Sequence, residues 1–558
     1  MFLTRPLCLA ILLLILLPLG ALDFWDEAPV DVLASELAGA MDDQELLGQV
    51  LLLGYQGASA SRDILRLIGR RNTGGIKIFG WNVKDLPTLA EAVSRMQRES
   101  QTTRFRIPLL VVTDQEGGWV RHVRSGTSET PGNLALGASN IPQDAYLTGY
   151  YIGLEMKALG INMNFAPTVD IYTNPEAHII GPRAFGDDPV RTGVLATAFF
   201  KGMDASGVIA TAKHFPGHGN ADADSHSALP IIPADWDTLW TTDLVPYRLL
   251  IREEIPAIMS GHLAFPNITG NLTPASLSSQ MIRELTREKM GFQGIIVTDD
   301  LIMEGVQHLP YDTATITRLA LEAGNDLILI SRPPELHERI YILLLDYMKN
   351  HPEFRETVRE SARRVLELKL RYLKREDAVP LYPALENLDR LIPAADGSDF
   401  FTDHAFRSVT PLRGDIPFPL PETTGSVLMV SQYDEFFEEG QKFFPGADRF
   451  SFSYAPFYYA ENSELRRFQR AVRGYDTILF CLANPNSLEM LKTLESFPGR
   501  VQVFSVLTPL YLTQVPWVKR ALALYGTSKA SFFAGFSAST GIYNPPGVLP
   551  LSVNLRGD

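Results

Sequence analysis

Ionisable side chains directly follow five consecutive apolar runs of the sequence. They include carboxylates, an ammonium group and imidazoles, which serve in proteins as nucleophiles, general acids and general bases. Burying such a group is costly unless it is paired or functional. One such residue alone is more often a helix cap or a core ion pair, but five positions in succession predict a catalytic or binding centre. The residues are Asp114, Asp170, Lys213 with His214, His262, and Asp299 with Asp300.

The densest of these stretches reads KHFPGHGNADADSH over residues 213–226. Its first two histidines, His214 and His218, are four residues apart, a spacing that can hold zinc on a helix. Pro216 and Gly217 lie between them and oppose a helix. We therefore expect no metal site here.

The end of the same stretch places an aspartate two residues before a histidine. In a turn, the Asp224 carboxylate can accept a hydrogen bond from the His226 imidazole and fix its tautomer and charge. A histidine held in this way can act as a general acid near neutral pH. The structural alternative is an Asx-turn beside an exposed histidine.

Eight short apolar runs alternate with longer amphipathic stretches and must position these groups. The runs are apolar on both faces, which is typical of fully buried parallel strands. Eight strand–helix units predict an α/β fold, a (β/α)8 barrel with catalytic groups at the carboxyl ends of its strands. An open doubly wound sheet is the rival, but no G-x-G-x-x-G follows the first strand. The runs are Leu51–Gln56, Gly75–Phe79, Pro108–Thr113, Ile161–Phe165, Val208–Ala212, Ala257–Ser260, Gly294–Thr298 and Asp326–Ile330.

The composition changes after the last of these units. We predict the barrel over residues 30–375, a proline-containing linker over 376–399 and a smaller α/β sandwich-like domain over 400–558. Residues 1–22 hold Arg5 and an apolar run that ends at Ala21. They predict a secretory signal peptide or an uncleaved N-terminal membrane anchor. The expected location is therefore the cell envelope, periplasmic or secreted.

Composition excludes several classes of protein. The 558 residues carry 64 acidic and 50 basic side chains, a formal net charge of −14, which is unsuited to nucleic acid. A hydrophobic content of 46% argues against global disorder. Two cysteines are too few for a disulfide scaffold or a cysteine-based zinc finger.

Several motifs resemble one enzyme family. The run over residues 213–226 resembles the signature of the β-N-acetylhexosaminidases of glycoside hydrolase family 3. DQEGG from Asp114, APTVD ending at Asp170 and GPRAFG from Gly181 are similar to that family, as are TPGNLALGA from Thr130 and TDDLIMEG from Thr298. Near the C-terminus, LYGTSKASFFAGF and NPPGVLPLSV resemble the end of two-domain members.

The resemblance implies a role for each matching residue. Asp299 would be the nucleophile that forms a covalent glycosyl–enzyme intermediate, His226 the acid/base, and Asp224 its orienting partner. The hydroxyls of a terminal N-acetylglucosamine would be bound by Asp114, Arg183, Lys213 and His214. The implied substrates are peptidoglycan fragments or chitooligosaccharides, and no cofactor or metal is implied. Retaining hydrolysis needs this pair of groups on opposite sides of the bond, and an ordinary imidazole pKa of ~6.5 suits the acid.

One position departs from the family pattern. The family has a sugar-contacting arginine eight residues after the DQEGG aspartate, and here this residue is His122, flanked by Arg121 and Arg124. Either arginine can take over the contact, or the contact is lost. Arg121 and His122 are therefore candidate sugar-binding residues.

Two other functions fit the same residues. One is a family 3 β-glycosidase with another sugar preference, which the departure at His122 suggests. The other is a non-catalytic, envelope-bound binding protein built on the barrel. The complete set of Asp224, His226 and Asp299 favours the enzyme, because a binding scaffold needs none of the three.

Overall fold

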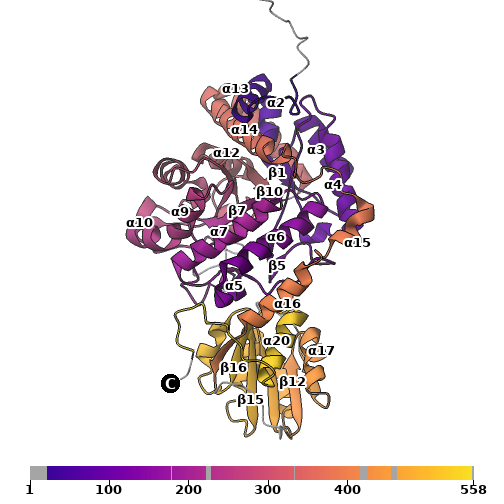
Figure 1. Ribbon diagram of the computed structural model, residues 1–558. Helices are drawn as coiled ribbons and strands as arrows, with labels where there is room; N and C mark the ends of the chain where they lie inside the picture. The colour runs from indigo at the N-terminus through magenta and orange to yellow at the C-terminus, as the bar shows by residue number, and fades with distance from the viewer. Residues whose placement is uncertain are drawn as a thin grey trace, which may run out of the picture.

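The computed structural model describes residues 22–177, 179–221, 228–331, 333–414, 425–453 and 462–555. Its first part is a barrel of eight parallel strands, in the order β10-β1-β2-β3-β6-β7-β8-β9 (Figure 1). A parallel bridge between Val297 and Leu327 joins β9 to β10 and closes the ring. The predicted (β/α)8 barrel is confirmed, with a strand at every predicted run. The strands are β1 (Leu51–Gly54), β2 (Gly75–Lys77), β3 (Leu110–Thr113), β6 (Met163–Asn164), β7 (Ile209–Phe215), β8 (Ala257–Ser260), β9 (Ile295–Thr298) and β10 (Ile328–Ile330).

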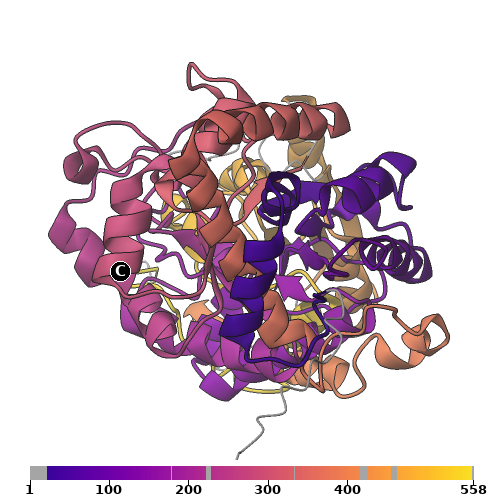
Figure 2. The same ribbon diagram turned by 90° about the horizontal axis from the view of Figure 1, so that it is seen from above.

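Helices surround the strands when the molecule is seen from above (Figure 2). Aspartate caps start several of them: Asp188 accepts from the backbone N–H groups of Val190 and Arg191, and Pro189 occupies the first turn. Among the described residues, no helix is both long and apolar enough to cross a bilayer. The barrel helices include α3 (Arg62–Arg71), α4 (Leu86–Ser100), α6 (Pro142–Ala158), α7 (Pro189–Ala205), α9 (Leu244–Arg252), η5 (Gln280–Lys289), α12 (Thr313–Ala323), α13 (Pro334–Asn350) and α14 (Pro352–Leu373).

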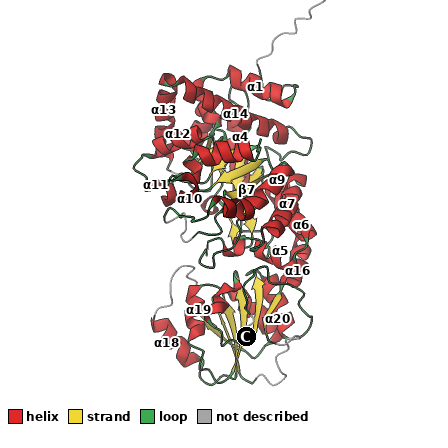
Figure 3. Cartoon of the chain, turned by 90° about the vertical axis from the view of Figure 1, so that its left-hand side faces the viewer, coloured by secondary structure: helices red, strands yellow, loops and turns green. Residues whose placement is uncertain are grey.

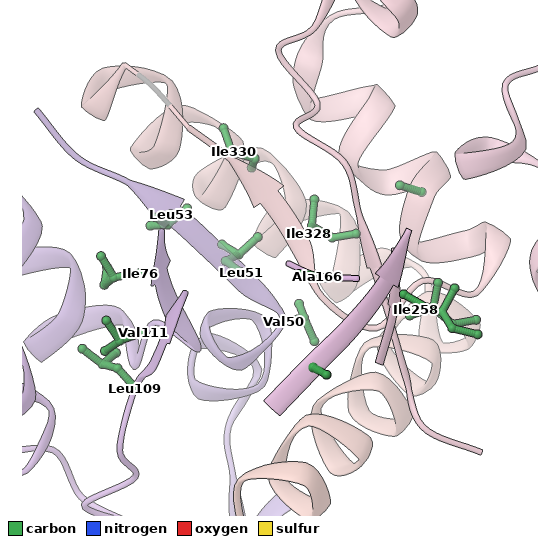
Figure 4. Close-up of a cluster of buried hydrophobic side chains, with 14 of the residues drawn as sticks. Val50, Leu51, Leu53, Ile76, Leu109, Val111, Ala166, Ile258, Ile328 and Ile330 are labelled. Atoms are coloured by element: carbon green, nitrogen blue, oxygen red, sulfur yellow. The ribbon is translucent and has the colours of Figure 1, made fainter. Parts of the chain in front are cut away.

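Most of the barrel strands divide their side chains between two apolar clusters. Successive residues of a strand point to opposite faces. Leu51 and Leu53 of β1 join the layer between strands and helices (Figure 4), whereas Leu52 between them joins a second cluster. That second cluster is the barrel interior, because it collects side chains from strands all around the ring. Its members include Leu52, Leu110, Val112, Met163, Phe165, Ile209, Met259, Ile295, Val297 and Leu329.

The amino-terminal end of the barrel is closed by α14. Val365 and Leu368 of this helix pack on the interior cluster. Beside them, Lys369 is fully buried, and its ammonium donates a hydrogen bond to Oε1 of Gln49 at 2.8 Å. Burial lowers the pKa of Lys369 to about 7, because an ammonium group is poorly solvated there.

Lys369→Met is expected to stabilise the protein below neutral pH. The ordinary lysine pKa is 10.5 and the pKa of Lys369 in the folded protein is about 7. Between these two pH values the lysine is protonated in the unfolded chain but mostly neutral in the folded protein. Wild-type stability therefore rises with pH across this window, and the full cost of burying the charge applies below it. The variant should gain on the order of 2 kcal/mol in free energy of unfolding at about pH 6, and less at about pH 9.5. Urea unfolding of the wild type and the variant at both pH values measures this gain in free energy of unfolding. The same gain at both pH values would contradict the prediction.

The second part of the chain is a six-stranded sheet flanked by helices (Figure 3). Its strands are parallel except β11, which pairs antiparallel with β16. Apolar clusters cover both faces of the sheet, and buried Cys481 of β14 lies in one of them. The strand order is β11 (Thr410–Arg413), β16 (Ala521–Tyr525), β15 (Arg500–Val506), β14 (Thr477–Leu482), β12 (Val427–Ser431) and β13 (Asp448–Ser451), and the helices are α16 (Gly397–Ser408), α17 (Asp434–Phe443), α18 (Asn462–Ala471), α19 (Pro485–Lys492) and α20 (Lys529–Ser539).

The segment expected to be a linker packs against the barrel. It contains a short helix, α15 (Leu388–Leu391), and both Leu388 and Ile392 are buried in the barrel's core. The backbone N–H of Ala394 donates to the buried Glu155 carboxylate of α6. The segment therefore fixes the start of α16 rather than acting as a loose spacer, and the domain boundaries at 376–399 stay a prediction.

The second domain lies against the carboxyl end of the barrel (Figures 1 and 3). Thr508, just after β15, is hydrogen-bonded to the hydroxyl of Tyr172 at 3.3 Å. Near the C-terminus, Val548 donates to the carbonyl of Ala138, and the Ser552 N–H donates to the Asp187 carboxylate. The rim of the barrel is thus held by the second domain on one side.

Candidate active site

Strand periodicity turns three predicted residues toward the barrel axis. Asp114, Lys213 and Asp299 each stand an even number of positions after an interior apolar residue of the same strand. Lys77, the last residue of β2, lies on the same face. Its Nζ is 4.9 Å from the centre of the interior Phe165 ring. The apolar residues that set this face are Leu110 and Val112 of β3, Ile209 of β7, and Ile295 and Val297 of β9.

Asp114 lies between two buried lysines. It accepts hydrogen bonds from the ammonium groups of Lys77 and Lys213, the latter at 2.5 Å. Burial acts to raise the pKa of Asp114, but the charges of Lys213 and Lys77 outweigh it and hold the pKa well below its ordinary value. The carboxylate is therefore ionised and oriented by two cations.

Glu116 extends this network to Arg183. It accepts from Lys213 at 2.6 Å and from the Arg183 guanidinium through two bonds of 2.9 and 2.8 Å. Burial acts to raise the pKa of Glu116, yet Arg183 and Lys213 lower it to about 2. The bidentate pair fixes the orientation of the Arg183 guanidinium within the network.

His214 is held between an acid and a cation. Its Nδ1 lies 2.8 Å from Oδ2 of Asp170, and its Nε2 lies 3.2 Å from Nη2 of Arg183. Since the carboxylate only accepts and the guanidinium only donates, Nδ1 carries the proton and Nε2 accepts. These partners place His214 in the polar network rather than in a zinc site.

Asp170 also anchors the start of the loop that follows β7. It accepts from the backbone N–H groups of His214 at 3.2 Å and His218 at 2.7 Å. Burial opposes ionisation, but His214 and these hydrogen bonds lower the pKa of Asp170 to about 2. One buried carboxylate therefore sets both the tautomer of His214 and the course of the loop.

Asp170→Asn is expected to lower kcat/KM about 10- to 100-fold. An amide does not fix the tautomer of His214, and it lacks the negative charge that Asp170 places beside the imidazole. The matched control is Asp188→Asn, since asparagine also caps a helix. Steady-state kinetics on an aryl β-N-acetylglucosaminide would show the difference. Equal activity of the two variants would mean that Asp170 only supports the fold.

Two adjacent carboxylates follow β9 and point in different directions. Asp299 continues the interior face, and its negative charge opposes the lowering of the Lys77 pKa that burial causes. Asp300 instead accepts from the backbone N–H groups of Ile302 and Ser331, and burial raises its pKa to about 6. Asp300 is thus a loop anchor.

His262 fixes the backbone at this point. Its Nε2 donates to the carbonyl of Asp300 at 3.1 Å, and its Nδ1 accepts from the hydroxyl of Ser276 at 2.8 Å. The ring is almost fully buried. His262 therefore positions the end of β9 and, through it, Asp299.

His122 reaches the network, and the two nearby arginines are directed elsewhere. The Nδ1 of His122 lies 3.8 Å from Oδ2 of Asp114, and burial beside Lys77 lowers the pKa of His122 to about 4. Arg121 donates to the carbonyl of Ser128 and to the Glu129 carboxylate, and Arg124 donates to the carbonyl of Arg121. A neutral imidazole therefore stands where the sequence resemblance predicts an arginine, and both nearby arginines are engaged by other groups.

Asp224 and His226 lie outside the described residues, but both ends of their loop are fixed at the site. Before the gap, Ala221 accepts a hydrogen bond from the Asn174 amide at 2.9 Å. After it, Pro230 accepts from the backbone N–H of Ala264, two residues beyond His262. The loop therefore starts and ends beside the carboxyl ends of β7 and β8.

Sequence reasoning missed two members of the network, Lys77 and Glu116. Two signals in the sequence could have found them. Lys77 is a lysine inside an otherwise apolar strand, and Glu116 is a second acid two residues after Asp114. Period-two alternation places both side chains on the interior face.

Comparisons with known proteins agree with this geometry. Residues 44–368 match the profile of the glycosyl hydrolase family 3 N-terminal domain. A β-hexosaminidase of Pseudomonas aeruginosa is 34% identical over 281 residues, which cover 50% of this chain and 81% of that protein. Beta-hexosaminidase A of Pseudoalteromonas piscicida is 34% identical over 283 residues, 48% of this chain and 47% of the relative, so the match spans about half the length of that relative.

Among solved structures, a family 3 β-N-acetylglucosaminidase from Paenibacillus sp. str. FPU-7 is similar over both domains. It superposes with a TM-score of 0.82 at 28% identity, covering 93% of this chain and all of that one. The profile match covers more than half of the chain, and the barrel carries the polar centre at its carboxyl end. The chain therefore belongs to glycoside hydrolase family 3 and is a glycoside hydrolase.

Proposed function

We propose that the protein is a retaining exo-β-N-acetylglucosaminidase that removes terminal β-linked N-acetylglucosamine. The observation that carries this proposal is the placement of Asp299 on the interior face of β9, where its charge interacts with Lys77 of the network around Asp114 and Lys213. A carboxylate nucleophile next to fixed donors and acceptors for sugar hydroxyls is what the first step of retaining hydrolysis requires. The relatives named β-hexosaminidase support the amino sugar as substrate.

In the proposed reaction, Asp299 attacks the anomeric carbon while the bond to the leaving oxygen breaks. His226 gives its proton to that oxygen, and a glycosyl–enzyme ester remains. Water then attacks the same carbon, His226 takes its proton, and the Asp299 carboxylate is released. Asp224 is proposed to hold the His226 ring and stabilise its charged form.

The buried network suits recognition of a chain end. Lys213, Glu116 and Arg183 are almost completely buried, and only part of the Asp114 side chain is open. Charged groups arranged in this way can exchange hydrogen bonds with the hydroxyls of one terminal sugar. This supports an exo-acting enzyme.

We also propose that the enzyme acts in the cell envelope, on peptidoglycan fragments or chitooligosaccharides. The support is the sequence of residues 1–22, where Arg5 precedes an apolar run typical of a signal peptide or anchor. Fractionation of cells followed by N-terminal sequencing of the protein tests the location. Recovery of the uncleaved chain in the cytosol would contradict it.

A second candidate is a β-glycosidase of another sugar specificity. The observation that favours it is His122, a neutral imidazole beside Asp114 where the family has an arginine. The loss of one cation changes which substituents the sugar pocket can hold.

A panel of aryl β-glycosides separates the two candidates. We expect the N-acetylglucosaminide to be cleaved with the highest kcat/KM, and proton NMR of early product to show the β-anomer. Faster cleavage of an aryl glucoside or xyloside would favour the second candidate. Initial release of the α-anomer would contradict a retaining mechanism.

A further inference from the structure

A stacked aromatic pair follows β2, at the carboxyl end of the barrel. Phe79 follows β2, and Trp81 lies in the short helix η1 (Gly80–Asn82) that comes next. Their ring centres are 4.3 Å apart and their planes differ by 9°. Although tryptophan is usually well buried, Trp81 is 47% exposed.

The fold holds this pair in a defined orientation. The indole N–H of Trp81 donates to the carbonyl of Tyr55, the residue after β1, at 3.1 Å. Asn82 is fully buried, and its amide donates to the carbonyls of Tyr55 and Gly57 while its oxygen accepts from the Phe79 N–H. Both rings are thus fixed by the backbone that ends β1 and β2.

The pair adjoins the polar network directly. The Lys77 ammonium lies 5.0 Å from the centre of the Phe79 ring, and the His122 ring lies 5.5 Å from it. Exposure increases outward along this path, from buried Lys77 through the His122 side chain at 25% to Trp81. The aromatic surface therefore begins where the pocket for the terminal sugar opens to solvent.

We propose that the exposed Trp81 ring, supported by the Phe79 ring stacked on it, is a platform for the sugar ring on the leaving-group side of the scissile bond. A pyranose ring carries apolar C–H groups on its faces and hydroxyls on its edge, so it is complementary to an aromatic plane beside polar groups. Because the buried network encloses the terminal residue, the next residue of an oligosaccharide lies toward the mouth. This inference rests on the proposed exo-glycosidase function. It predicts that the enzyme prefers oligosaccharides to simple glycosides, because only an oligosaccharide places a sugar ring on the platform.

The test compares two substrates that differ only in the leaving group. N,N′-diacetylchitobiose places a sugar ring at the platform, whereas 2-acetamido-2-deoxy-β-D-glucopyranosyl fluoride places a single atom there. Trp81→Ala should lower kcat/KM for chitobiose about tenfold, mainly through KM, and change the value for the fluoride less than about twofold. Trp81→Phe should recover most of the loss.

The matched control is Tyr382→Ala, which removes an equally exposed aromatic side chain beside Arg98, at the end of α4 that leads to the barrel's amino-terminal side. It should leave both substrates unaffected. An equal loss for both substrates in Trp81→Ala, or no loss for either, would overturn the platform. If the wild-type protein cleaves neither substrate, the proposed function itself fails and the platform fails with it.

Discussion

Asp299→Ala is expected to lower kcat/KM for an aryl β-N-acetylglucosaminide by about 10⁴- to 10⁶-fold. The side chain supplies the electron pair that forms the glycosyl–enzyme bond, and no neighbouring group can replace it: Asp300 faces away and is engaged by the N–H groups of Ile302 and Ser331. Melting temperature should change little, because the carboxylate lies on the interior face at the barrel's open end.

Added azide gives this variant a second readout. An external anion can enter the space that the carboxylate leaves and attack an activated substrate, so we expect partial recovery of rate and an α-glycosyl azide as product. Asp312→Asn, a change at the helix cap of α12, is the matched control and should keep wild-type activity. Retention of activity within about tenfold in Asp299→Ala would remove Asp299 from the mechanism.

Asp114→Asn is expected to lower kcat/KM about 10³-fold and to destabilise the protein by about 3 kcal/mol. The change removes a ligand for sugar hydroxyls and leaves the buried ammonium of Lys77 without its carboxylate. Lys213 keeps Glu116 as a partner. Most of the loss of stability should therefore come from the unpaired ammonium of Lys77.

The double variant Lys77→Met with Asp114→Asn separates the two effects. Removing both charges should restore most of the stability, because no unpaired ion remains, but it should not restore activity. Thermal unfolding and steady-state kinetics on the same samples provide the comparison. Recovery of activity together with stability would mean that Asp114 serves the fold and not the substrate.

The barrel was predictable because its strands are buried on both faces. Runs such as Leu51–Gln56 and Gly294–Thr298 have no polar face, and a parallel sheet covered by helices is the arrangement that accommodates them. The same reasoning located Asp114, Lys213 and Asp299, since a charge next to such a run must stand at the strand's end. Period-two alternation then fixes which of Asp299 and Asp300 faces the interior.

The pairing of charges could not be predicted in the same way. Lys77 and Glu116 acquire their roles only when β2, β3 and β7 become neighbours, because each contacts a residue far away in the sequence. Arg121 was a plausible sugar ligand from its position beside His122. The folded loop instead brings Ser128 and Glu129 within reach of its guanidinium.

The segment after the barrel shows the limit of composition. Its prolines and scattered polar residues are typical of a linker, and the two apolar residues Leu388 and Ile392 form too short a pattern to predict a packed helix. Both are nevertheless buried against the barrel. The partner surface that buries them is formed by distant residues, which a local pattern does not reveal.

The measurement that tests the central claim most directly is trapping of the intermediate with a 2-acetamido-2-deoxy-5-fluoro-glycosyl fluoride, followed by peptide mapping. The account predicts one added glycosyl group, on the peptide that contains Thr298–Gly305, with the ester at Asp299. A label on any other residue, or time-dependent inactivation without a covalent adduct, would contradict it.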